Sequence, residues 1–144
     1  MPRESRLALF LVAVSCAGQR MPEARTLGGS ASEVEINQVV ERAIEADSRL
    51  EPADSLYAPY ATVIADGTVR RRPPRYAGIS EGGEIAITST QLQTRGTTAW
   101  GSVEYRWTSD RSHRAQAGRA SLVLVPAQGR NGWWIVQAHS STAR

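Results

Sequence analysis

The chain has 144 residues, of which 41% are hydrophobic and 22% are charged. This balance is typical of one globular domain with a single core, and it argues against a disordered chain or a protein with several membrane spans. The net charge is +3 and all 17 basic residues are arginine. Because most of them are scattered and form no basic helix or aromatic-basic strand pattern, we do not expect nucleic-acid binding.

The N-terminal segment has the features of an export signal. Two arginines precede an apolar run at residues 7–14, which is too short to span a bilayer as a helix. The sequence AVSC that follows resembles a bacterial lipobox ending at Cys16, although Ala13 stands where such motifs usually have leucine. We predict a signal peptide or lipobox over residues 1–16 and an exported protein, either periplasmic or membrane-anchored through a lipidated Cys16. Secretion after cleavage at Ala17 and a cytoplasmic protein are the alternatives.

A flexible linker and a long helix are predicted next. Residues 17–32 are rich in Gly, Ser, Ala and Pro without periodicity, so the domain is expected at residues 33–144. Apolar residues from Ile36 to Leu50 recur at spacings of three and four, which predicts an amphipathic helix. Ser32 is the expected N-cap, and Glu35 completes a capping box.

The rest of the chain predicts mainly strands. A second short helix is expected at residues 51–57, a strand at 61–65, a turn at Asp66-Gly67 and a polar loop at 68–84. Four strands at hairpin spacing follow, at residues 85–94, 98–108, 119–125 and 133–139. Helices followed by an antiparallel meander predict an α+β fold, with the sheet curled round the long helix into a cone whose open end is a pocket.

The last hairpin also predicts a partner. Its strands contain uninterrupted apolar runs at residues 123–125 and 133–136, on either side of a turn at 129–132. An antiparallel sheet usually leaves one face to water and shows alternation, so these runs need cover on both faces. We expect the helix to cover one face of the hairpin and a second subunit to cover the other.

Three stretches resemble the nuclear transport factor 2-like superfamily, particularly its SnoaL-like and ketosteroid isomerase-like branch. They are LYAPYATVIADG at residues 56–67, AWGSVEYRW at 99–107, and GRASLVLV…GWWIVQAHSS at 118–141. The resemblance covers about residues 33–141. It implies a cone-shaped, cystatin-like fold with a long helix on a curved antiparallel sheet, and a homodimer packed sheet to sheet. It specifies no activity, because the superfamily includes isomerases, cyclases, hydrolases, dehydratases, binding domains and dimerisation hubs.

The catalytic residues of ketosteroid isomerases are not retained at the matching positions. The general-base aspartate matches Ala65, the oxyanion-hole tyrosine matches Ala43, and its aspartic acid partner matches Ala120 or Ser121. Asp66 lies one residue later, where a strand turns its side chain to the other face. A dienolate mechanism of the isomerase kind is therefore not expected.

His139 and Asp47 form the candidate catalytic pair. Alternation places Gln137 and His139 on one face with Ile135, and on the concave face His139 would act as base, acid or anion donor. Packing near the dimer seam is the alternative for His139. Asp47 falls on the buried stripe of the helix, where a carboxylate is costly unless paired. It is predicted either to face the cavity with a raised pKa or to bond backbone amides near Glu51.

An aromatic wall is the candidate ligand site. Tyr105 and Trp107 share one face of their strand, which the resemblance directs towards the cavity, and core packing is the alternative. The other face carries Glu104 and Arg106, which are expected to be cross-strand or dimer partners. The candidate ligand-binding residues are Val103, Tyr105, Trp107, Gln137, Tyr57 and Arg119, with the face of Arg119 left open because its register is not fixed.

No cofactor or metal is predicted, since His113 and His139 are the only histidines and there is no phosphate-binding glycine loop. The arginines at positions 70, 71, 72 and 75 are either an exposed loop or an anion-binding rim.

Three functions remain open. The first is an exported homodimer that binds a small, largely apolar molecule in its cone. The second is a SnoaL-like enzyme that uses His139 and Asp47, or Tyr105, for proton transfer on a carbonyl or epoxide. The third is a dimerisation hub without a ligand. A filled cone would favour the hub, and an open cone with Asp47 beside His139 would favour the enzyme.

Overall fold

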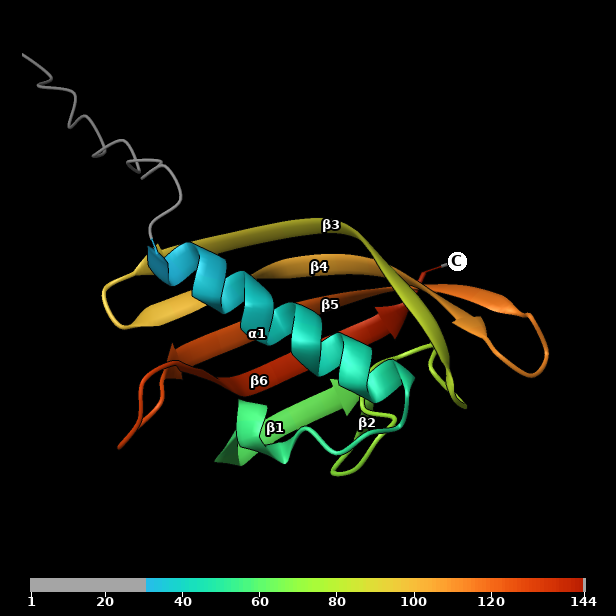
Figure 1. Cartoon of the computed structure of the whole chain (residues 1–144), viewed down its shortest axis with the longest axis horizontal. Helices are drawn as coiled ribbons and strands as arrows, with labels where there is room; N and C mark the ends of the chain where they lie inside the picture. Colours follow the sequence, from blue (N-terminus) through green and yellow to red (C-terminus); the bar gives the residue numbers. More distant parts are fainter. Residues whose placement is uncertain (1–30, 144) are drawn as a thin grey trace, which may run out of the picture.

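A computed structural model describes residues 31–143 of the chain. One helix lies across one face of a curved six-stranded sheet of order β2-β1-β6-β5-β4-β3, which confirms the predicted α+β class (Figure 1). The predicted signal segment, Cys16 and most of the predicted linker lie outside the described residues. The elements are α1 (Ala31–Ser48), a 3₁₀ turn η1 (Asp54–Leu56), β1 (Tyr57–Ala65), β2 (Thr68–Val69), β3 (Gly83–Arg95), β4 (Thr98–Ser109), β5 (Ala115–Pro126) and β6 (Trp133–Thr142).

The helix follows its predicted stripe as far as Asp47, but it ends at Ser48, and Leu50, predicted in the stripe, is 43% exposed. Ile36, Val40 and Ile44 are almost fully buried, whereas Glu41 and Glu45 are exposed. The described helix begins at Ala31 and already contains Ser32, so the predicted N-cap lies inside the first turn. None of the helices within residues 31–143 is both long enough and apolar enough to cross a membrane.

The predicted second helix is reduced to the 3₁₀ turn Asp54–Leu56. Tyr57 pairs with Ile135 of β6, so the chain enters a strand at the position where the sequence predicted the end of a helix. Residues 57–60, expected in part to be helix and connection, therefore belong to β1.

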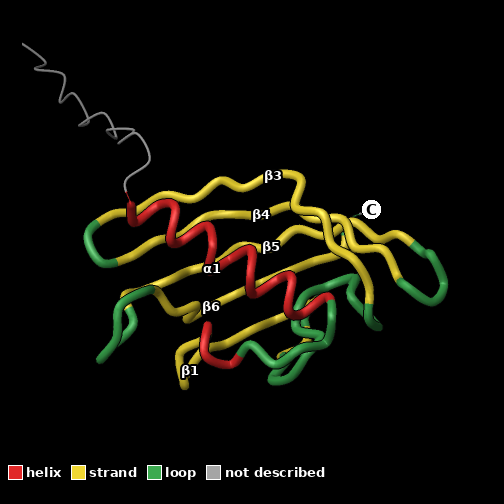
Figure 2. Tube along the Cα trace, in the orientation of Figure 1, coloured by secondary structure: helices red, strands yellow, loops and turns green. Residues whose placement is uncertain are grey.

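The sheet is mixed and not wholly antiparallel. Strands β3 to β6 form the expected antiparallel meander (Figure 2), but β1 pairs with β6 in parallel (Figure 1). The predicted turn after β1 is present, since Asp66 and Gly67 have φ values of 47° and 77° and connect β1 to β2. Positive φ at both central residues is the conformation that a tight hairpin turn requires.

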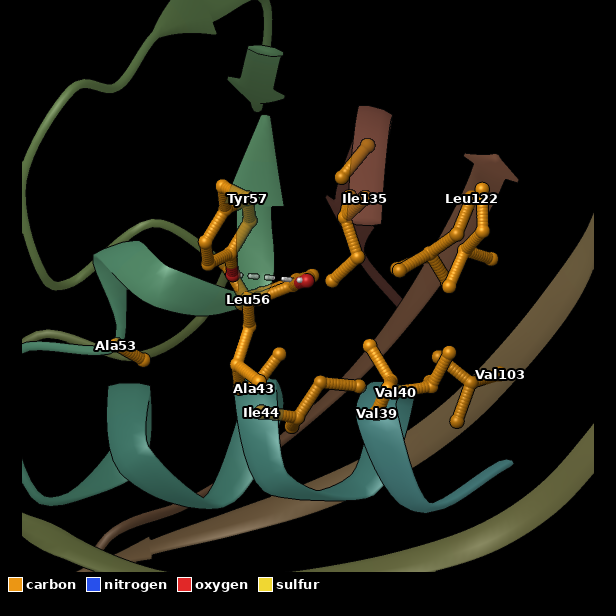
Figure 3. Packing of buried hydrophobic residues seen from close by; sticks show 14 of the residues in the cluster. Val39, Val40, Ala43, Ile44, Ala53, Leu56, Tyr57, Val103, Leu122 and Ile135 are labelled. Atoms are coloured by element: carbon orange, nitrogen blue, oxygen red, sulfur yellow. Dashed lines mark hydrogen bonds between the residues drawn. The ribbon is translucent and has the colours of Figure 1, made fainter. Parts of the chain in front are cut away.

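The face of the sheet covered by α1, called the inner face below, holds the core. Val40 of α1 points towards Val103 of β4 and Leu122 of β5 (Figure 3). A segment at residues 70–82, called the inner loop, closes this core, because its residues Tyr76, Ala77 and Ile79 are buried. The opposite face, called the outer face, is not covered by any element of the described chain.

Candidate functional site

The structure places His139 on the outer face. Ile135 is completely buried, whereas Gln137 and His139 are exposed. Adjacent residues of β5 pair with Ile135 and Gln137, so Val136 is an extra residue in β6. Such a β-bulge breaks the two-residue alternation. Gln137 and His139 share one face, as predicted, but the prediction that Ile135 lies on the same face is wrong.

Asp47 is buried at 1% exposure and binds the inner loop. Its two carboxylate oxygens accept hydrogen bonds from the amide of Arg75 at 2.8 and 2.7 Å, and one of them also accepts from the amide of Tyr76 at 2.9 Å. Burial raises the pKa of Asp47, while the two amides and the charge of Arg75 act in the opposite direction. The amide of Glu51 instead bonds the carbonyl of Ala46, so the predicted bond between Asp47 and amides near Glu51 is wrong.

The candidate acid–base pair is not assembled in this structure. Asp47 projects from α1 into the buried region between helix and sheet, where its partners are backbone amides. His139 is exposed and lines a groove on the outer face. The sheet therefore separates the two side chains, and a single substrate cannot contact both.

Three tyrosines fill the interior beside Asp47. The hydroxyl of Tyr57 donates to that of Tyr76 at 3.2 Å, and the rings of Tyr76 and Tyr105 meet edge to face with centroids 6.3 Å apart. The hydroxyl of Tyr105 donates to the carbonyl of Ala77 at 2.7 Å. Burial raises the pKa of Tyr57 to about 12 and raises those of Tyr76 and Tyr105 further above the usual range. All three hydroxyls are therefore protonated at neutral pH, and each takes part in a hydrogen bond within the fold.

The predicted aromatic wall faces inward, as expected, but its residues pack in the core. Val103, Tyr105 and Trp107 are 0%, 1% and 3% exposed. Gly118 lies opposite Tyr105 on β5, and a Cβ there would lie 2.5 Å from the tyrosine ring, so the glycine lets the ring rest on the strand. The indole Nε1 of Trp107 is buried without an acceptor in the described part of the chain.

The positions that match the isomerase residues are buried alanines. Ala43, Ala65 and Ala120 are at most 2% exposed. Asp66 is exposed, and its carboxylate accepts a hydrogen bond from the amide of Thr142 at 2.9 Å. These positions therefore supply no carboxyl or hydroxyl group to the interior.

A groove of about 520 Å³ crosses the outer face. Trp100 lies in it, with neutral polar residues from β3 to β6, including Gln91, Ser102, Ser121 and Gln137. His139 is the titratable side chain at its border. Within residues 31–143, no three His, Cys, Asp or Glu side chains are grouped as a metal site would require.

Arg119 also belongs to the outer face, which resolves the face that the sequence left open. Its Nε donates to Glu104 Oε1 at 3.0 Å across the β4–β5 pair. The expectation that Glu104 has a cross-strand partner is confirmed. Arg119 is therefore not a residue of the interior.

Partly exposed apolar side chains lie beside the groove on the outer face. Trp100 is 37% exposed, and four further residues of β5 and β6 on this face are partly exposed. We call this set the outer patch: Trp100, Val123, Val125, Trp134 and Val136.

Comparisons with known proteins support the fold. No protein-family model matches the chain, and no curated protein matches its sequence. A nuclear transport factor 2-like protein with a cystatin-like fold from Novosphingobium aromaticivorans superposes with a TM-score of 0.60 at 11% identity, over 77% of this chain and 81% of the other. A putative ketosteroid isomerase from Shewanella frigidimarina gives 0.58 at 20% identity, over 78% and 95%. The hub of CaMKII from S. rosetta gives 0.59 at 15% identity, over 80% and 98%.

These similarities establish the nuclear transport factor 2-like, cystatin-like fold, and the fold expected from the sequence is confirmed. Proteins with this fold differ in function, so the function must be argued from the residues of this chain.

Proposed function

We propose that this domain is a homodimeric assembly module without catalytic activity, and that its outer face forms the dimer interface. The observation that carries the proposal is the contrast between the two faces. On the inner face, Tyr76 and Tyr105 are 1% exposed and fill the space beside Asp47. On the outer face, the outer patch is only partly covered.

The composition of the outer face fits a symmetric interface. A two-fold interface brings the same patch of each subunit together, and the buried centre of such interfaces is poor in charge and rich in aromatic residues. The outer patch contains two tryptophans and three valines beside the neutral groove. The ion pair between Glu104 and Arg119 lies on the same face and would belong to its rim. The match to a hub domain is consistent with an assembly role.

Val123→Glu is expected to convert the dimer to a folded monomer. Val123 pairs with both Trp100 and Gln137, which places it in the middle of the outer face. A carboxylate there would be buried without a partner in the dimer but solvated in the monomer. Size-exclusion chromatography with light scattering measures the change, and Thr97→Glu, in the exposed turn between β3 and β4, is the matched control. A Val123→Glu protein that remains dimeric would contradict the proposed interface.

A small apolar ligand in the interior is the second candidate. It is favoured by the Nε1 of Trp107, a buried donor without an acceptor among the described residues, because a ligand oxygen would satisfy it. Entry would require the inner loop to move, since Tyr76 occupies the space. An acid–base role for Asp47 and His139 is not part of this proposal, because the two groups lie on opposite faces.

We further propose that the chain is exported and lipidated on Cys16. The proposal rests on the sequence at residues 1–16 and on the single cysteine. Mass spectrometry of the protein extracted from membranes of a bacterial host should find the cysteine modified by lipid and residues 1–15 removed. An intact N-terminus beginning at Met1 would contradict this prediction.

A further inference from the structure

The margin of the sheet at β1 is an open strand edge. On its far side β1 pairs with β2 only at Ile64 and Ala65, so residues 57–62 have no strand beyond them in the described sheet. Pro59 lies in this stretch and lacks an amide hydrogen, as is tolerated on edge strands. Unpaired backbone groups at a sheet edge can pair with an added strand.

A groove of about 550 Å³ runs along this edge. Tyr60 and Val69, which line it, are 66% and 59% exposed, large fractions for such side chains. The groove therefore offers backbone groups and apolar contacts together. An extended peptide uses this combination when it adds to a sheet.

The charge of the groove is strongly positive. Arg70, Arg71 and Arg75 line it together with a single carboxylate, that of Asp54. Arg75 is fixed in place, because its guanidinium pairs with Asp54 and lies 4.7 Å from the centre of the Tyr57 ring. Arg70 and Arg71 are exposed and have no ion-pair partner within residues 31–143.

We propose that this edge binds an extended, acidic peptide segment of a partner protein, which adds as a strand beside residues 57–62. The backbone of the segment pairs with β1, its carboxylates pair with Arg70 and Arg71, and its apolar side chains contact Tyr60 and Val69. The edge lies at the opposite margin of the sheet from β3, and β1 adjoins β6, which carries Trp134 and Val136 of the outer patch. The groove itself is lined by no residue of the outer patch.

The test uses the full chain and a fluorescent peptide of alternating glutamate and valine, with fluorescence anisotropy as the readout. Arg70→Gln combined with Arg71→Gln should weaken binding about tenfold, because two exposed charge pairs are lost. The matched control, Arg95→Gln with Arg114→Gln, removes the same charge from exposed positions at the end of β3 and just before β5, and it should bind as the wild type does. Equal binding by the two double variants would overturn the proposal.

Two further peptides test the chemistry and the geometry separately. A peptide with glutamine in place of glutamate should bind about tenfold more weakly, as the arginine double variant does. A glutamate peptide N-methylated at alternate residues keeps its charge but cannot complete a strand ladder, so it should also lose binding, while the unmodified peptide should protect backbone amides of β1 from hydrogen exchange. Undiminished binding of either modified peptide would overturn the proposal, since the first would show that acidity is not needed and the second that no strand is added.

Discussion

Tyr76→Ala is expected to lower the free energy of unfolding by about 3–5 kcal/mol, as for other large aromatic side chains removed from a core. Tyr76 is 1% exposed, packs against Tyr105 and accepts the hydrogen bond of the Tyr57 hydroxyl. Its removal leaves a cavity and an unpaired buried donor. Urea unfolding followed by circular dichroism measures the loss. Tyr76→Phe keeps the ring but leaves the Tyr57 hydroxyl without its acceptor, so it should cost only about 1–3 kcal/mol; an equal cost for both variants would show that the ring is not packed.

The same variant separates the two proposed functions. If Tyr76 fills the interior, Tyr76→Ala should gain saturable binding of a small aromatic molecule such as indole, because its ring can replace that of Tyr76 in the cavity beside the Tyr57 hydroxyl. The wild type should not bind indole in the interior. Wild-type binding in a titration followed by nuclear magnetic resonance, with shifts confined to the core residues of α1 and β4, would favour the ligand-binding candidate.

Asp47→Ala is the second change with a large expected effect, a loss of roughly 2–5 kcal/mol in the free energy of unfolding. The buried amides of Arg75 and Tyr76 lose their acceptor, and each unsatisfied buried group costs about 1–3 kcal/mol. Asp47→Asn should cost less, because one side-chain oxygen remains. Glu45→Ala, on the exposed side of the same helix, should change stability by less than about 0.5 kcal/mol. An Asp47→Ala protein as stable as this control would show that the inner loop is not held by Asp47.

The pH dependence of stability follows from the same carboxyl group. Burial raises the pKa of Asp47 in the folded chain above its ordinary value of 3.8, so the folded state holds this proton more tightly than the unfolded state does. The contribution of Asp47 to the free energy of unfolding is therefore greatest below pH 3.8. It declines as the pH rises through the raised pKa of the folded state. The free energy of unfolding, measured over this pH range, should show this decline in the wild type. The Asp47→Ala variant should not show it. A contribution that grows with pH would mean that the amides outweigh burial.

The strands could be predicted because the residue patterns that mark them are local. The face of the sheet on which each side chain of β6 lies could not be predicted. The run Trp133 to Val136 is apolar without alternation, so nothing in it marks Val136 as a bulge. A one-residue shift reverses every side chain that follows. Alternation continued from Ile135 therefore predicts the wrong face for Gln137 and His139, whereas the inward face predicted for Tyr105 and Trp107, on a regular strand, is confirmed.

The inner loop shows a different limit of the sequence. Asp47 was recognised as a polar group on a buried stripe, but its partners lie 28 and 29 residues further along the chain. Tyr76 stands in a polar segment rich in Arg, Pro and Gly, where Tyr76 and Ile79 are the only large apolar side chains of the inner loop and the main sign of burial. The parallel pairing of β1 with β6 also joins distant segments, which no short-range pattern reports.

Sedimentation equilibrium of the purified chain across a dilution series tests the proposed assembly most directly. The outer patch predicts a mass twice that of the 15.7 kDa chain, falling towards the single-chain mass only on strong dilution. A folded protein with the single-chain mass at every concentration would contradict the proposal that the outer face is a dimer interface.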